Sequence, residues 1–98
     1  MLEHMKGLVE DMWEELEGAC HYAEKAMEAR DNDPGKVSTY TEMSRQELAH
    51  FDNLHRMAAE KVSMHKGDAH IEAVWDWEHG KMMRKAAKIR AMLEVAKG

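Results

Sequence analysis

Apolar residues recur along three long stretches of the chain at alternating spacings of three and four residues. That period places them on one face of an α-helix. In the first stretch, residues 2 to about 31, the stripe is Leu8, Met12, Glu15, Ala19, Tyr22, Ala26 and Ala29. Glu15 is the charged member of this stripe, whereas Glu14 and Glu17 lie off it. We therefore expect Glu15, and not its acidic neighbours, to face the core.

The second stretch runs from about Pro34 to His65 and the third from about Ala69 to Ala96. The stripe of the second is Val37, Tyr40, Met43, Glu47, His50, Leu54, Met57 and Lys61. Glu47 and His50 lie at its middle, three residues apart, and therefore point the same way from a helix. The stripe of the third is Ile71, Trp75, His79, Met82, Ala86, Ile89 and Leu93. Ionisable side chains thus interrupt the predicted core face of each helix.

Two short breaks separate these stretches. Asp33 suits a helix N-cap and Pro34 the first helical position, where its missing N–H costs nothing. Gly67 suits a helix C-terminus and Asp68 the next N-cap. Connections this short join antiparallel helices. The predicted fold is all-α: residues 1–98 form a single domain, a helical hairpin followed by a third long antiparallel helix.

Three long helices with one narrow apolar stripe each bury little apolar surface. A chain of 98 residues has a thin core in any case. Small chains commonly gain the missing burial by oligomerisation. We therefore expect a homo-oligomer, at least a dimer, in which the helices of two chains complete a larger bundle such as a four-helix bundle.

The composition excludes several classes of partner. The formal charge is −5 and no basic block is present, so nucleic acid and anionic membranes are poor partners. No apolar run approaches the ~20 residues of a membrane span. The N-terminus has no signal-peptide layout. The single cysteine, Cys20, excludes an internal disulfide framework. These features together predict a cytoplasmic protein.

Charged groups on apolar stripes need a stabilising partner, because an unpaired buried carboxylate is costly. A Glu-x-x-His pair on one helix, with a lone Glu on its neighbour, is half of a di-metal carboxylate site. Carboxylates bridge and neutralise two divalent ions, and imidazole adds a terminal ligand that suits iron or manganese. We therefore predict Glu15, Glu47 and His50 as metal ligands and as the catalytic residues. These ligands suit two ions of iron or manganese per site, and zinc is an alternative.

The positions of these residues along the predicted hairpin support that assignment. Measured from residue 32 at the hairpin tip, Glu15 lies 17 residues before, Glu47 15 after and His50 18 after. In an antiparallel pair all three are therefore at one level, about 25 Å from the tip at ~1.5 Å per residue.

The other half of the site has two possible sources. Two chains related by a two-fold axis would supply four carboxylates and two histidines, as a full di-metal site requires. The rival source is Asp76 with His79, an Asp-x-x-His pair within the same chain. His79 should face residue 55 rather than 50 in an antiparallel pair, a mismatch of about 8 Å. His55 and His79 would instead form a separate polar contact.

The stretch Glu14-Glu15-Leu16-Glu17-Gly18-Ala19-Cys20-His21-Tyr22-Ala23 resembles the first helix of the ferritin-like superfamily, in its rubrerythrin-like and encapsulated-ferritin branches. Glu47-Leu48-Ala49-His50 is similar to that family's Glu-x-x-His. The resemblance covers about residues 8 to 58. It implies a non-haem di-iron centre that oxidises iron with oxygen or peroxide. The encapsulated branch adds a site made by two short chains and a location inside a protein compartment. The chain departs from four-helix members in lacking a second pair of ligand helices, and from rubrerythrins in lacking a rubredoxin-type cysteine cluster.

Two functions follow from these observations. The first is a small di-iron protein with ferroxidase or peroxidase-like activity, in which Glu47 bridges the metals and Glu15 and His50 are terminal ligands. Tyr22 would not bind the metal itself but would hydrogen-bond to one of the metal ligands. The second is a non-enzymatic assembly or adaptor protein, in which buried polar residues set register and partner choice. Removal of metal by a chelator distinguishes the two.

Overall fold

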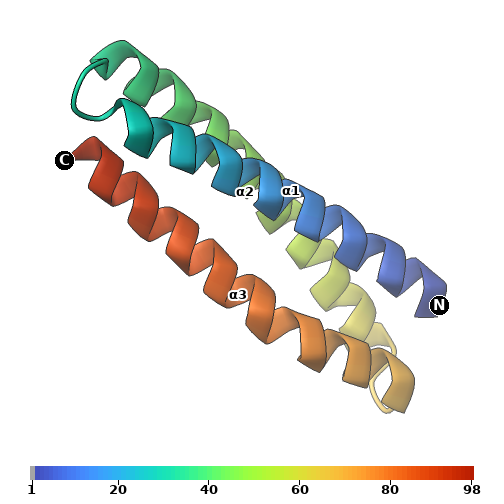
Figure 1. Cartoon of the computed structure of the whole chain (residues 1–98). Coiled ribbons are helices and arrows are strands. Elements are labelled where there is room, and N and C mark those ends of the chain that lie inside the picture. The colour runs from blue at the N-terminus through green and yellow to red at the C-terminus, as the bar shows by residue number, and fades with distance from the viewer. Residues whose placement is uncertain (1) are drawn as a thin grey trace.

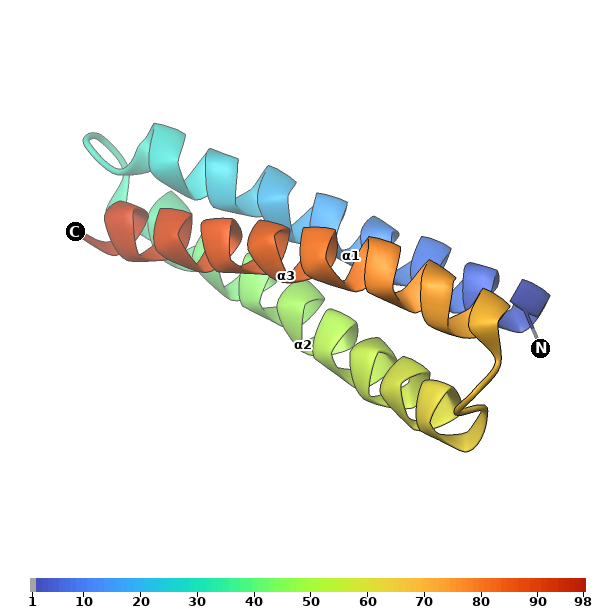
Figure 2. The same ribbon diagram turned by 90° about the horizontal axis from the view of Figure 1, so that it is seen from below.

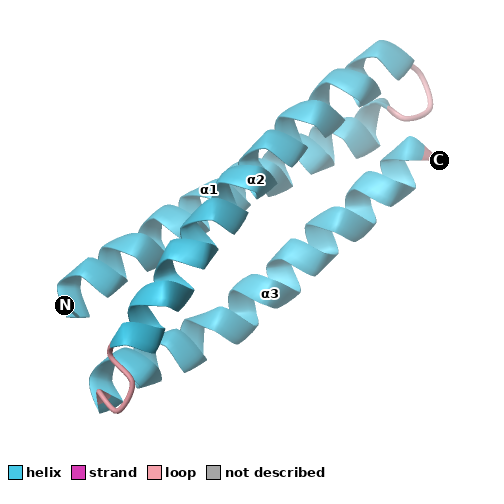
Figure 3. Cartoon of the chain, turned by 180° about the vertical axis from the view of Figure 1, so that it is seen from behind, coloured by secondary structure: helices cyan, strands magenta, loops and turns pink. Residues whose placement is uncertain are grey.

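The computed structural model describes residues 2–98 and consists of three α-helices joined by two short loops. Helix α1 spans Leu2–Ala29, α2 spans Pro34–Met64 and α3 spans Ala69–Lys97. The helices run antiparallel along a rod of 52 × 16 × 15 Å, with the loops at opposite ends (Figure 1, Figure 3). The all-α fold predicted from the sequence is therefore confirmed.

Both breaks have the cap chemistry that the sequence predicts. The Asp33 carboxylate accepts a hydrogen bond from the backbone N–H of Lys36, and Pro34 begins α2. The Asp68 carboxylate accepts from the N–H groups of His70 and Ile71 at the start of α3. Gly67 has φ +96°, a left-handed conformation that other residues rarely adopt. These caps satisfy backbone donors that a helix start leaves unpaired.

Small side chains bring α1 close to α2. Ala19 and Ala23 of α1 and Ser44 of α2 are fully buried. The Ser44 hydroxyl donates a hydrogen bond of 2.7 Å to the Ala19 carbonyl oxygen, which ties the two helices together at mid-length. This close contact lies at the same level as the ionisable residues Glu15 and Glu47.

The face that α2 turns to the core differs from the predicted stripe by one position. The buried residues of α2 are Thr41, Ser44, Leu48, Phe51 and Ala58. Tyr40, Met43 and Glu47 are half-buried, and His50 and Met57 are exposed. The reason is that α2 carries apolar residues on two adjacent faces, and only the face with Leu48 and Phe51 packs into the core. The expectation that Glu47 and His50 lie inside the core was therefore wrong.

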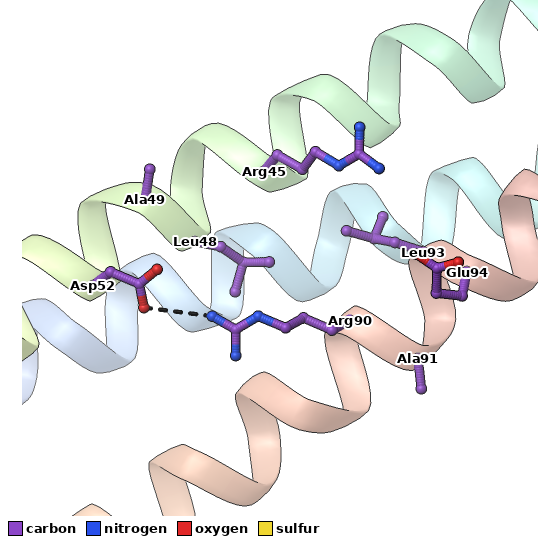
Figure 4. A pocket seen from close by; sticks show the side chains of 8 residues that line it. All are labelled: Arg45, Leu48, Ala49, Asp52, Arg90, Ala91, Leu93 and Glu94. Atoms are coloured by element: carbon purple, nitrogen blue, oxygen red, sulfur yellow. Dashed lines mark hydrogen bonds and ion pairs between the residues drawn. The ribbon is translucent and has the colours of Figure 1, made fainter.

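Helix α3 lies along the α1–α2 pair (Figure 2). A groove runs between α2 and α3. The groove has a volume of about 450 Å³, and Leu48 and Leu93 form part of its floor. Arg90 of α3 reaches across it to Asp52 of α2, with 3.4 Å between Arg90 Nη2 and Asp52 Oδ1 (Figure 4). Across residues 2–98, no helix is both long enough and apolar enough for a membrane span.

Candidate metal centre

Glu15 of α1 meets Glu47 and His50 of α2 on one side of the hairpin. One ligand atom from each of the three side chains can be chosen so that all lie within 4.8 Å of one another. The Nδ1 atom of His50 is 3.3 Å from Glu15 Oε2. The structure thus brings together the three residues that the sequence places at one level of the hairpin.

The cluster lies at the edge of the bundle. The side chains of Glu15 and His50 are 26% and 58% exposed, and Glu47 is half-buried. The expectation that all three side chains are buried was wrong, because α3 packs on the other side of the α1–α2 hairpin. The cluster therefore has one side supported by α1 and α2 and one side open to further ligands.

Gly18 makes room for the Glu47 carboxylate. A Cβ atom at Gly18 would lie 3.2 Å from Glu47 Oε2, which is tighter than ordinary van der Waals contact. Sequence reasoning missed this residue. The sequence offered one indication, because a glycine in the middle of a predicted helix lowers helix stability by about 1 kcal/mol relative to alanine. Gly18 also follows Glu15 by three residues, so the two share a face of α1.

The two carboxylates are poorly compatible when both are charged. Hydrogen bonding with Glu15 raises the pKa of Glu47 above its ordinary value, and burial and the negative charge of Glu15 act in the same direction. The charge of His50 acts weakly in the opposite direction. A cation placed between the two carboxylates would relieve the same conflict between their charges.

The donor set fits a divalent transition metal. Two carboxylates and an imidazole are ligands of iron, manganese and zinc. Ligand atoms bound at right angles to one ion at ~2.1 Å lie about 3 Å apart. The 3.3 Å between His50 Nδ1 and Glu15 Oε2 is close to that separation.

Asp76 and His79 are not part of this cluster. The Nε2 atom of His79 lies 3.0 Å from Nε2 of His55, and Asp76 is exposed on α3. The predicted contact between His55 and His79 is therefore confirmed, and closure of the centre within one chain by Asp76 and His79 is not what the structure shows. The cause is the depth mismatch between α2 and α3.

Tyr22 lies two turns along α1 from Glu15. Its ring is stacked with that of Tyr40 of α2, with centroids 6.2 Å apart and planes inclined by 19°. This contact helps to hold α1 against α2 on the side of the cluster. Hydrogen bonding from Tyr22 to a metal ligand stays a prediction.

Comparison of the chain with protein-family models, curated proteins and solved structures gave no match.

Proposed function

We propose that this protein is a small di-metal carboxylate protein that binds two iron ions and oxidises Fe²⁺ with oxygen or peroxide. The observation that carries the proposal is the convergence of Glu15, Glu47 and His50 within 4.8 Å. The raised pKa of Glu47 adds support: its hydrogen bond with Glu15 is the main cause, and burial and the Glu15 charge act the same way, so a cation at this place would favour the charged form. Manganese or zinc are alternative occupants.

A second copy of the chain is the proposed source of the remaining ligands. Two ions need more than the two carboxylates and one imidazole that one chain supplies. The open side of the cluster lies between half-buried apolar side chains, Met43 on one side and Leu54 on the other, and Met57 beyond them is 45% exposed. Docking of two such faces about a two-fold axis would bury these side chains and double the ligand set.

The side chains have distinct roles in this proposal. Glu47, which Gly18 lets lie against α1, would hold both metals, and Glu15 and His50 would each hold one of them. Bound Fe²⁺ ions supply the electrons that reduce oxygen or peroxide. The neighbouring apolar side chains would exclude bulk water from the centre once a second copy covers it.

The test combines metal stoichiometry with particle mass. Anaerobic calorimetry with Fe²⁺, together with light scattering, should give two ions per pair of chains for the wild type. Glu47→Gln should remove this binding and abolish oxidation of added Fe²⁺. Glu17→Gln is the matched control, because Glu17 is an exposed carboxylate of α1 outside the cluster. An unchanged stoichiometry in Glu47→Gln would exclude the assignment.

Chelator treatment separates this function from a purely structural one. If the metal completes the dimer, then removing it should lower both the melting temperature and the particle mass. Retention of mass, helicity and melting temperature would favour an assembly protein whose polar residues set register.

A further inference from the structure

His55 of α2 and His79 of α3 meet across the boundary between these helices. Their Nε2 atoms are 3.0 Å apart, their ring centroids 5.1 Å apart and their planes inclined by 26°. Because the nitrogens are so much closer than the centroids, the rings meet through their Nε2 edges. One Nε2 carries a hydrogen and the other accepts it, so two ligand atoms already point at one place.

Aromatic side chains hold the two imidazoles in position. The indole of Trp75 is stacked on His79 with centroids 4.7 Å apart, and it lies 5.5 Å from the His55 ring. The fully buried Phe51 ring also lies next to His55, with ring centroids 6.1 Å apart. Both histidines are half-buried. Orientation of a ligand ring by its neighbours is a large part of what makes a metal site.

The environment also favours the neutral form of His55. Burial is the main cause that lowers its pKa, and the neighbouring His79 adds to it, whereas the Asp52 charge acts in the opposite direction. Neutral imidazole is the form that binds a metal, because protonation would occupy the ligand atom.

We propose that His55 and His79 bind one divalent ion of the kind that imidazole prefers, Cu²⁺ or Zn²⁺, between their Nε2 atoms, with water completing the coordination. A tetrahedral ion at ~2.0–2.1 Å from each nitrogen holds them about 3.3 Å apart. The nitrogens would therefore separate by about 0.3 Å, and both rings would turn so that their Nε2 lone pairs face the ion instead of each other. The ring that donates through Nε2–H in the metal-free pair would change tautomer: it would lose the Nε2 hydrogen to water and take one up on Nδ1, so that both rings bind through Nε2 as neutral imidazoles.

This second site does not rest on the proposed function. It is formed by α2 and α3, whereas the cluster of Glu15, Glu47 and His50 is formed by α1 and α2. Its donors are nitrogens alone, which favour copper and zinc over the iron and manganese that carboxylates accept. The carboxylate that acts on His55, Asp52, points across the groove to Arg90 and stays out of the pair (Figure 4).

The test is a Cu²⁺ titration in a protein that lacks the first site. In the double variant Glu47→Gln, His50→Gln, one Cu²⁺ per chain should bind. The electron paramagnetic resonance spectrum should show two coupled nitrogens. Adding His79→Gln should weaken binding at least tenfold. Adding His21→Gln should leave it unchanged, since His21 is exposed on α1 far along the sequence from the pair. The side-chain amide that His79→Gln introduces can still hydrogen-bond to His55, which protects the fold.

A fluorescence measurement gives an independent check. Bound Cu²⁺ next to His79 should quench Trp75, so that Trp75→Phe removes most of the metal-dependent quenching and Trp77→Phe does not. Trp77 is 71% exposed and serves as the control. Equal Cu²⁺ affinity with and without His79, or a spectrum with fewer than two nitrogens, would overturn the proposal.

Discussion

The two polar clusters of this bundle lie on different sides of α2 and bring together different kinds of group. Around the helix, His55 is about 140° from His50 and about 80° from Glu47 at 3.6 residues per turn. The first cluster joins α1 to α2 and combines two carboxylates whose closeness raises the pKa of Glu47. The second joins α2 to α3 and combines two imidazoles that satisfy each other by a hydrogen bond.

This difference predicts how each cluster depends on a ligand. The carboxylate cluster is unfavourable at neutral pH until a proton or a cation neutralises it. The histidine pair is already satisfied without any ion, and half-buried beside Trp75. A ligand is therefore expected to change the stability of the α1–α2 side more than that of the α2–α3 side.

The largest effect on stability is expected for a substitution of Phe51, which lies on α2 between His50 and His55. Phe51 is fully buried, so Phe51→Ala should lower the free energy of unfolding by about 3–5 kcal/mol. It should also raise the pKa of His55 towards its ordinary value, because burial is the main cause of the present shift. The pKa of Glu47 should change little, since Glu15 is its main cause.

Urea unfolding and a nuclear magnetic resonance titration of the side chains measure both effects of Phe51→Ala. Met64→Ala is the control, since Met64 at the end of α2 is 73% exposed and its loss should cost far less. Equal pKa changes at Glu47 and His55 would show that the two clusters are not independent.

The second largest effect is expected for Gly18→Ala, which should change metal affinity and protein stability in opposite directions. Gly18→Ala should weaken metal binding about tenfold, because the new methyl group displaces the Glu47 carboxylate. The metal-free protein should become more stable by up to about 1 kcal/mol, since alanine favours a helix and the displaced group is a flexible side-chain end.

Gly7→Ala provides a matched control for Gly18→Ala. Gly7 is also in α1, and a Cβ atom there meets nothing within 4 Å. It should give the same gain in helix stability without any loss of metal affinity. Metal titration and thermal unfolding of both variants measure the comparison, and equal affinities would remove Gly18 from the centre.

In the metal-free protein, Glu47 and His55 should make the stability change with pH in opposite directions. The pKa of Glu47 is raised, so its contribution to stability is present below 4.5 and is lost as pH rises through the folded-state value. The pKa of His55 is lowered, so its contribution is lost as pH falls below 6.5 towards the folded-state value.

Melting curves from pH 4 to 8 in the presence of a chelator measure these contributions. Glu47→Gln should stabilise the metal-free protein more at pH 7 than at pH 4. His55→Gln should make the decline below pH 6.5 shallower. Parallel profiles for wild type and both variants would contradict the assigned causes.

The helices and their caps were predictable from the sequence, because periodicity and the Asp-Pro and Gly-Asp breaks act locally. The meeting of Glu15 with Glu47 and His50 was also predictable, since a short loop fixes the register of an antiparallel pair. The degree of burial of Glu15, Glu47 and His50 was not predictable from the sequence. Helix α2 has apolar residues on two faces, and which of them α3 covers depends on packing across the whole bundle. The role of Gly18 depends on a close approach that spacing alone does not reveal.

The smallest effect expected is at Asp52, whose carboxylate acts on His55 and pairs with Arg90 across the groove (Figure 4). Both members of that pair are more than half exposed, so Asp52→Asn should change the free energy of unfolding by less than about 0.5 kcal/mol. The pKa of His55 should nevertheless fall further, because Asp52 is the group that raises it. A magnetic resonance titration of the imidazoles measures the shift, with Glu42→Gln, an exposed carboxylate elsewhere on α2, as the control. If the pKa of His55 did not move, then burial and His79 alone would determine the state of the pair, and the two clusters would differ even more sharply in their dependence on neighbouring charge.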